Sequence, residues 1–438
     1  MVPTTTSEPA SETSVVTASP RRAGALIALL GALTAIAPLA TDMYVPGFPE
    51  MGRTLRASDS AVQLSMTSFL AGLVIGQLLI GPLSDGLGRR RLLVPGTALF
   101  AVLSLVCAFA PTIELLITAR FLEGVAGAAG MVLARAVLTD RFHGPELPCY
   151  FSLLTMVLSV APVVAPVIGG ALLSVGSWRL AFVALAIFGA LLLLAVLPGV
   201  PESLPPERRH QGGVASSFRA MVRLLGHRTF LGCTLTLAFA AAALFACIAG
   251  SSFVFQEVYD TSAGLYSLVF AVNACGMLLV GAVFGVLSRR LTMGTLLSAS
   301  VAVAVAAVLV QVLLLVTVGG SLAGTWVTLF FAAFGIGGIF PASMSMGQSL
   351  GREASGAASA LLGGIQFLFG ALASPLVGAF GTASAMPMAA IMLVSLICAT
   401  LCLVFLVRPG RKQAPRGSGG PPLCAGPRRA GVAQPRSL

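Results

Sequence analysis

Long apolar stretches dominate the chain and predict membrane-spanning helices. About 20 consecutive apolar residues are enough for a helix to cross the hydrocarbon core of a bilayer. Twelve such stretches lie at 24–48, 61–82, 92–110, 113–137, 150–174, 179–199, 229–256, 264–287, 292–317, 322–348, 355–380 and 384–407. They are continuously apolar rather than alternating, which argues against a transmembrane β-barrel. The pattern predicts an all-α membrane protein with twelve transmembrane helices.

A second pattern repeats at a spacing of 200 residues and predicts two similar halves. In each copy, an apolar run marked by two glycines ends in a pair of arginines. The matched positions are Gly76 with Gly276, Gly81 with Gly281, Arg89 with Arg289 and Arg90 with Arg290. Internal repeats of this kind are typical of carriers built from two related bundles. We therefore expect two pseudo-symmetric six-helix bundles at 22–200 and 229–408.

The distribution of charge predicts the orientation of these helices. The chain is 57% hydrophobic and only 9% charged, whereas soluble domains carry roughly 25% charged residues. Its net charge of +11 comes from arginines concentrated in alternate connections. Such an excess marks the cytoplasmic side, so both termini are expected there, and the charge indicates topology rather than nucleic-acid binding. The segments 1–21 and 409–438 are expected to be disordered cytoplasmic tails, and 201–228 a cytoplasmic central loop.

Three charged residues, Asp42, Arg120 and Glu123, fall well inside predicted helices. A charge at the centre of a membrane helix costs about 2.5–3.5 kcal/mol on insertion scales, so each is a candidate functional residue. Asp42 and Arg120 are expected at similar depths and could share one cavity. Glu123 lies three residues after Arg120 and could pair with it. Two plainer interpretations stay open: Asp42 only terminates its helix, and Arg120 with Glu123 is only a structural pair.

The residue types inside the predicted spans limit which proton-transfer, cofactor-binding and catalytic chemistry the protein can perform. All three histidines lie in predicted loops, so a carboxylate rather than a histidine relay would have to carry protons. No GxxxxGK[ST] loop is present to bind a nucleotide, and the cysteines show no metal-ligand spacing. Ser251 and Ser252 have no neighbouring base, which disfavours an intramembrane enzyme. Duplicated halves disfavour a channel, and no cofactor or metal is expected.

Several motifs resemble those of a known family. They are TDMYVPGFP (41–49), GPLSDGLGRRR (81–91), RFLEGVAGAAG (120–130), APVVAPVIGG (161–170), PESLPPERR (201–209) and AGSSFVFQ (249–256). Together they resemble transporters of the Major Facilitator Superfamily, and within it the Bcr/CflA group of drug:proton antiporters. The resemblance covers residues 22–408 and implies a multi-pass monomer in the bacterial cytoplasmic membrane.

The resemblance also implies roles for individual residues. Arg120 would take part in proton coupling, and Asp42 in protonation or contact with a cationic substrate. A cytoplasmic gate motif would comprise Gly81, Asp85, Gly88, Arg89 and Arg90. Bending and close packing of the fifth helix would depend on Pro162, Pro166, Gly169 and Gly170. Three positions depart from the family pattern: Gly86 replaces a basic residue, Glu123 replaces glutamine and Ala165 replaces glycine.

A few polar or aromatic residues in the apolar helices are candidates for the substrate cavity. They are Tyr44, Ser251, Phe253, Gln256, Asn273 and Gln366. A largely apolar cavity with few polar anchors suits amphipathic drugs better than sugars, although such residues can also simply hold helices together. We therefore predict export of small amphipathic compounds, driven by the proton gradient through alternating access. The imperfect fifth-helix motif keeps open a nutrient or metabolite symporter of the same fold.

Overall fold

The computed structural model describes residues 20–142, 147–208, 219, 221–288, 290–351 and 355–407, and no β-strand occurs among them. The first half contains α1 (Pro20–Thr34), α2 (Ile36–Asp42), the 3-10 turn η1 (Val45–Gly47), α3 (Phe48–Leu55), α4 (Asp59–Leu87), α5 (Arg89–Ala108), α6 (Ile113–Arg141), α7 (Leu147–Val175) and α8 (Arg179–Gly199). The short η3 (Pro206–Arg208) follows. The second half contains α10 (Arg228–Phe253), the π-helical turn η4 (Val254–Val258), α11 (Ala263–Leu287), α12 (Met293–Val318), α13 (Leu322–Leu350), α14 (Ser355–Ala379), α15 (Met386–Cys402) and η6 (Leu403–Val407).

The described residues contain twelve helical spans long and apolar enough to cross a membrane, which confirms the predicted number of spans. Hydroxyl side chains set where many of them begin. Ser58, Thr112, Ser262, Thr292 and Ser321 each accept a hydrogen bond from the backbone N–H three residues later. This N-cap satisfies a backbone group that the helix leaves unpaired.

The first span differs from its prediction. It runs from Ala23 to Leu55 rather than from 24 to 48, and it is divided into α1, α2, η1 and α3. The helix is interrupted between Asp42 and the 3-10 turn that contains Pro46, whose nitrogen cannot donate a helical hydrogen bond. Asp42 is therefore the last residue of α2 but lies in the middle of a longer span. The remaining predicted boundaries agree with the structure to within about five residues.

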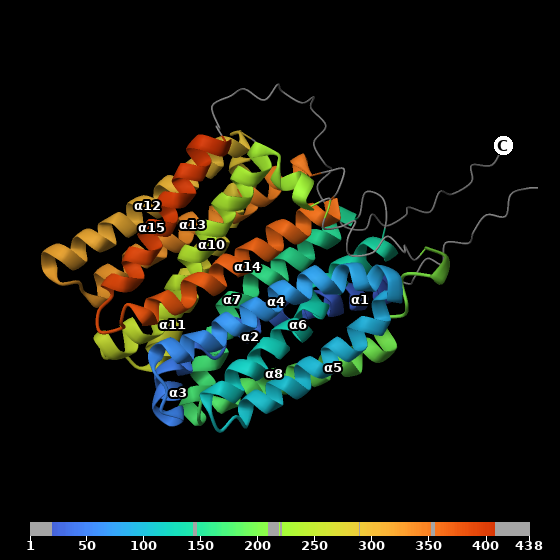
Figure 1. The fold of residues 1–438 in the computed structure, drawn as a ribbon, viewed down its shortest axis with the longest axis horizontal. Helices are drawn as coiled ribbons and strands as arrows, with labels where there is room; N and C mark the ends of the chain where they lie inside the picture. Colours follow the sequence, from blue (N-terminus) through green and yellow to red (C-terminus); the bar gives the residue numbers. More distant parts are fainter. Residues whose placement is uncertain are drawn as a thin grey trace, which may run out of the picture.

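The duplicated architecture is visible in the fold. Helices α1–α8 form one bundle and α10–α15 another, and they lie side by side (Figure 1). Gly76 of α4 packs against α6, where an added Cβ would lie 2.8 Å from the carbonyl oxygen of Val125. Gly276 of α11 packs against α13, where an added Cβ would lie 3.0 Å from the Phe330 ring. The repeated glycine thus serves the same helix contact in both halves.

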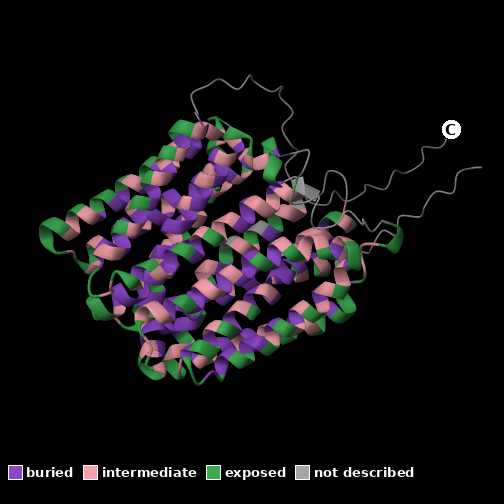
Figure 2. Ribbon diagram, viewed as in Figure 1, coloured by how far each residue is buried: buried purple, intermediate pink, exposed green. Residues whose placement is uncertain are grey.

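The two bundles meet along paired helices, with α4 beside α14 and α7 beside α11. Buried residues concentrate on the helix faces that pack together, as the colouring in Figure 2 shows. We call the end of the bundle at which α4 begins and α5 ends the Arg56 end. The opposite end, at which α4 ends and α5 begins, is the Gly88 end.

The expected tails and central loop lie mostly outside the described residues. The structure describes only Pro20 and Arg21 of the tail 1–21, and both belong to α1. It describes none of 409–438, and only 201–208, 219 and 221–228 of the central loop. Arg289 of the repeated arginine pair also falls outside the described part of the chain.

Candidate functional site

A fully buried ion pair lies in the middle of the first half. Arg120 and Glu123 are one helical turn apart on α6, and neither side chain is exposed. Nη1 of Arg120 donates to Oε2 of Glu123 at 2.8 Å, and Nη2 donates to the carbonyl oxygen of Ala40 at 2.8 Å. The arginine therefore connects α6 to α2. The predicted local pairing of these two residues is present.

Aromatic rings enclose the Arg120 guanidinium. Its central carbon lies 4.6 Å from the ring centre of Tyr44, 4.0 Å from that of Phe69 and 5.5 Å from that of Phe182. The Tyr44 hydroxyl is hydrogen-bonded to the Ser65 hydroxyl at 3.2 Å. A desolvated cation against aromatic faces is stabilised by about 2 kcal/mol or more per favourable contact. The cation is thus held by rings and by Glu123, out of contact with solvent.

Glu123 has further partners on α5. The Ser104 hydroxyl donates to Oε1 at 2.6 Å, and the Cys107 thiol lies 3.6 Å from Oε2. Both carboxylate oxygens are thus occupied by donors. Because buried charges need both a counter-charge and hydrogen bonds, these contacts stabilise the Arg120–Glu123 pair.

Asp42 lies near this pair but is not part of it. Its side chain is buried, with 4% of the residue exposed, and it forms no ion pair with any residue that the structure describes. Arg120 instead bonds to the backbone of Ala40, two residues earlier on α2. The neighbouring Met43 carbonyl packs against Gly169 of α7, where a Cβ would overlap it. The structure therefore places Asp42 and Arg120 close in the fold but pairs only Arg120.

The predicted gate motif is more helical than expected. Gly81, Ser84 and Asp85 all lie in α4, and the turn to α5 consists of Gly88 alone, with a φ of 102° that favours glycine. Arg89 bonds to Asp85 at 2.7 Å and to the Ser84 hydroxyl. The motif residues are thus brought together around Arg89.

Two acidic residues that the sequence analysis missed complete this network. Asp140 accepts from Nε of Arg89 at 3.2 Å and from the Ser203 hydroxyl at 2.9 Å. Glu202 accepts from the backbone N–H groups of Arg89 at 2.9 Å and Arg90 at 3.3 Å, and so caps α5. The acidic residue of the PES sequence was the available signal, because it directly follows the apolar span that ends at Gly199. These partners belong to the first half or to the start of the central loop, and none belongs to the second half.

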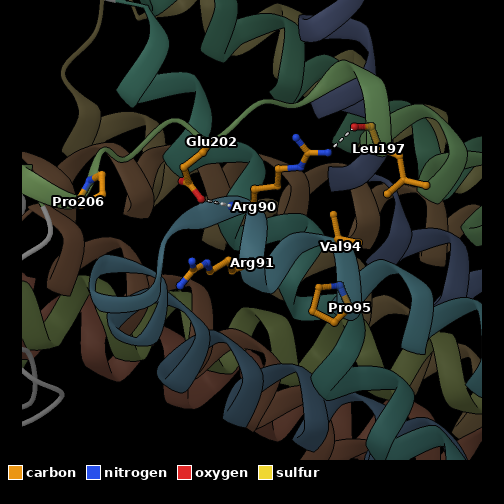
Figure 3. Close-up of a pocket in the computed structure, with 7 residues that line it drawn as sticks. All are labelled: Arg90, Arg91, Val94, Pro95, Leu197, Glu202 and Pro206. Atoms are coloured by element: carbon orange, nitrogen blue, oxygen red, sulfur yellow. Dashed lines mark hydrogen bonds between the residues drawn. The ribbon is translucent and has the colours of Figure 1, made fainter.

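A pocket of about 630 Å³ lies beside this network, as Figure 3 shows. Nη2 of Arg90 donates across it to the carbonyl oxygen of Leu197 at 2.6 Å. It is lined by Arg90, Arg91, Val94, Pro95, Leu197, Glu202 and Pro206. Since none of these lining residues belongs to the second half, this pocket does not lie between the bundles.

The fifth-helix motif lies within α7. Pro162 and Pro166 are both inside the helix. Gly169 faces α2, and Gly170 faces α11, where a Cβ would lie 2.7 Å from the Ser267 Cβ. These adjacent glycines let α7 approach one helix of each half. The structure thus places this motif at the contact between the bundles.

The cavity candidate Gln256 and the neighbouring Ser252 bond across the halves instead of ending in open space. The Ser252 hydroxyl donates to the carbonyl oxygen of Val45 at 2.8 Å. Nε2 of Gln256 donates to the carbonyl oxygen of Pro46 at 2.9 Å. These bonds join the end of α10 and the turn η4 to η1, near the Arg56 end.

The remaining candidates are spread over the second half. The Ser251 hydroxyl lies 3.0 Å from that of Tyr266, and the ring centre of Phe253 lies 6.0 Å from that of Phe48 in the first half. Asn273 is partly buried, and its Oδ1 has no hydrogen-bond partner among the described residues. Gln366 is also partly exposed. Tyr266, which the sequence analysis missed, is buried and is the partner of Ser251.

Two related six-helix bundles, with charged groups buried inside one of them, are the architecture of many secondary transporters. The chain belongs to the Major Facilitator Superfamily, which it matches over residues 30–375. It is therefore a transporter rather than an enzyme. Its twelve spans and its bacterial relatives indicate a multi-pass bacterial membrane protein.

Individual relatives agree with this assignment. The chain is 39% identical over 391 residues to an uncharacterized MFS-type transporter of Bacillus subtilis, covering 88% of this chain and 96% of the relative. It is 28% identical to a bicyclomycin resistance protein homolog of Haemophilus influenzae, covering 88% and 97%. The fold is similar to the crystal structure of a bacterial homolog of the human lysosomal transporter Spinster, with a TM-score of 0.64, 19% identity and coverage of 90% and 96%.

Proposed function

We propose that this transporter exports small amphipathic compounds from the bacterial cytoplasm in exchange for protons. The observation that carries the proposal is the buried Asp42, which has no cationic partner among the described residues. The name of the Haemophilus influenzae relative, a bicyclomycin resistance protein homolog, supports drug-like substrates and the Bcr/CflA grouping.

The charge of Asp42 needs a partner from outside the protein. A buried carboxylate without a counter-charge is costly, whereas a proton or a bound cation removes that cost. Arg120, the buried cation among the described residues, is already neutralised by Glu123. A proton and a cationic group of the substrate would then compete for Asp42, and this competition couples their movements in opposite directions.

Arg120 contributes to this mechanism by fixing the backbone before Asp42. Its bond to the Ala40 carbonyl oxygen holds the end of α2 against α6. Gly169 brings α7 against the next residue, Met43. The carboxylate of Asp42 is thereby positioned from both sides by helices of the first half.

The proton gradient supplies enough free energy for this exchange without a cofactor. One charge crossing the membrane yields about 2.3 kcal/mol per 100 mV, and each 1.4 kcal/mol corresponds to about a tenfold concentration ratio. One proton per cycle could therefore sustain a substantial export ratio.

The basic residues favour a cytoplasmic Gly88 end. Arg89, Arg90 and Arg91 begin α5 there, and Arg141 ends α6 there. Excess arginine on one side marks the cytoplasm, so both chain termini are assigned to that side. The inter-half hydrogen bonds near the Arg56 end would then close the outer side, leaving Asp42 to exchange with the cytoplasm.

Everted membrane vesicles test the proposal directly. With a pH gradient imposed, acid inside, addition of tetraphenylphosphonium, ethidium or bicyclomycin to vesicles containing the protein should release protons, seen as recovery of acridine orange fluorescence. Vesicles without the protein give the baseline. No response to any of these compounds, together with proton-driven nutrient uptake by intact cells, would favour a symporter instead.

A further inference from the structure

We propose that Gln63 is a positioning residue for the transport cycle: its single amide group acts as a latch that holds two helices of the second half, α10 and α14, at the Arg56 end. This inference rests on the proposed alternating access between the two halves, and it assigns a residue to the closure of one end.

Both ends of the Gln63 amide are used across the interface. From α4, Nε2 donates to the carbonyl oxygen of Ala249 on α10 at 3.3 Å. Oε1 accepts from the backbone N–H of Gly378 on α14 at 2.8 Å. The Gln63 side chain is completely buried. One side chain of the first half therefore joins two separate helices of the second.

Close backbone packing makes this reach possible. At Gly378, an added Cβ would lie 2.7 Å from the Cα of Ser60 and 2.8 Å from Oε1 of Gln63. Only glycine allows α14 to approach α4 so closely that its N–H meets the Gln63 oxygen. The donor and acceptor are thus matched to one relative position of the two bundles.

Other polar contacts concentrate at the same end. The Thr382 hydroxyl donates to Asp59, one turn before Gln63, and Ser252 and Gln256 donate to Val45 and Pro46. At the Gly88 end, the hydrogen bonds of Arg89 and Arg90 stay within the first half and Glu202, which directly follows it. Gln63 is fully buried and bonds to two helices of the second half at once.

The two Gln63 bonds favour the state that is closed at the Arg56 end over the state that is open there, without preventing the transition between them. Opening the Arg56 end would give water access to the Gln63 amide, Ala249 and Gly378, so each lost bond is partly replaced. Removing both bonds should therefore shift the ratio of the two states by about tenfold toward opening at this end.

Hydrogen–deuterium exchange of the full chain in lipid nanodiscs tests the latch, because it requires neither substrate nor a proton gradient. The variant Gln63→Met keeps the side-chain length but removes the amide group, and with it both the donor and the acceptor. Its matched control is Gln311→Met, because Gln311 is buried in α12 and neither its Oε1 nor its Nε2 has a partner in the described structure.

In Gln63→Met, deuterium uptake should rise in peptides at the Arg56 end, 48–60 and 376–386, and fall at the Gly88 end, 84–92. Gln311→Met should leave the difference in deuterium uptake between the two ends the same as in the wild type. Unchanged uptake in Gln63→Met, or a rise at both ends, would overturn the latch, since loss of packing alone loosens both ends. If the vesicle assay shows no drug export, the same pattern of deuterium uptake is still expected. Failure of the latch and failure of drug export are therefore distinguishable.

Discussion

Arg120 and Glu123 form an ion pair with 2.8 Å between Nη1 and Oε2, and the pair has no access to solvent. The charges cancel inside the first half, so the pair adds no net charge to the membrane interior. Its two members are consequently interdependent: either one alone would be an uncompensated buried charge.

This dependence predicts how the pair responds to substitution. Arg120→Met alone should lower the free energy of unfolding by about 3–5 kcal/mol, because the Glu123 charge is left buried without its partner. The double variant Arg120→Met with Glu123→Gln should recover most of that loss. Thermal unfolding in detergent, measured for the wild type, both single variants and the double variant, checks the expected coupling.

The same variants separate the two roles considered for Arg120. If Arg120 takes part in proton coupling, the stable double variant should still fail to release protons in vesicles. A double variant that is stable and still couples proton release to substrate would show that the pair has only a structural role. Losses that simply add in the double variant would contradict the coupling itself.

Gly169 is predicted to be intolerant of even a methyl group. A Cβ at this position of α7 would overlap the carbonyl oxygen of Met43, next to Asp42. Overpacking of this kind costs about 1–3 kcal/mol and displaces the backbone. We expect Gly169→Ala to reduce proton-coupled transport about tenfold or more while the protein still inserts.

The control for this substitution is Gly86→Ala, because Gly86 has no atom within 4 Å of an added Cβ. Transport rates normalised to the amount of protein in the membrane compare the two variants. Equal rates in both would show that the contact between α7 and the backbone beside Asp42 has no influence on transport.

The hydrophobic pattern predicts most of the fold, because span length and apolarity are local properties of the chain. The duplicated glycines likewise predict the two halves, and Gly76 and Gly276 make equivalent contacts. The end of α2 at Asp42 agrees with the interpretation, left open above, that Asp42 terminates its helix. The hydrophobic pattern could not predict that the span continues to Leu55, because the helix breaks inside an apolar run and then resumes.

Contacts between residues that lie far apart along the chain could not be predicted from the sequence either. The spacing of Arg120 and Glu123 predicts their pairing because residues three apart share a helix face. Glu202 reaches the start of α5 from 113 residues away along the chain, and Gln63 reaches Gly378 from 315 residues away. Only the packing of the helices places these groups together.

Glu202 is predicted to stabilise the Gly88 end by capping α5. Its carboxylate accepts from the backbone N–H groups of Arg89 and Arg90, and a negative charge at a helix N-terminus is favourable. Glu202→Ala should therefore lower the free energy of unfolding by about 0.5–2 kcal/mol. Thermal unfolding measures this effect, and Glu207→Ala is the control because Glu207 is exposed. An equal change in the free energy of unfolding of both variants would show that Glu202 does not stabilise the protein by capping α5.

Asp42→Asn is predicted to abolish exchange while leaving the protein in the membrane. Asparagine keeps the size and polarity of the side chain but can neither take up a proton nor offset the charge of a cationic substrate. Because Asp42 forms no ion pair with the described residues, its neutralisation should not leave a buried cation unpaired. In everted vesicles, tetraphenylphosphonium should then release no protons beyond the baseline of vesicles without the protein.

The matched control for Asp42→Asn is Asp260→Asn. Asp260 is exposed at the Arg56 end with a φ of 51°, a conformation that asparagine adopts readily, so the variant loses the same charge without strain. It should retain full exchange. Normal proton release by Asp42→Asn would exclude Asp42 as the exchange carboxylate. Loss of proton release in both variants would attribute the effect to net charge, because only the buried position of Asp42 distinguishes the two substitutions.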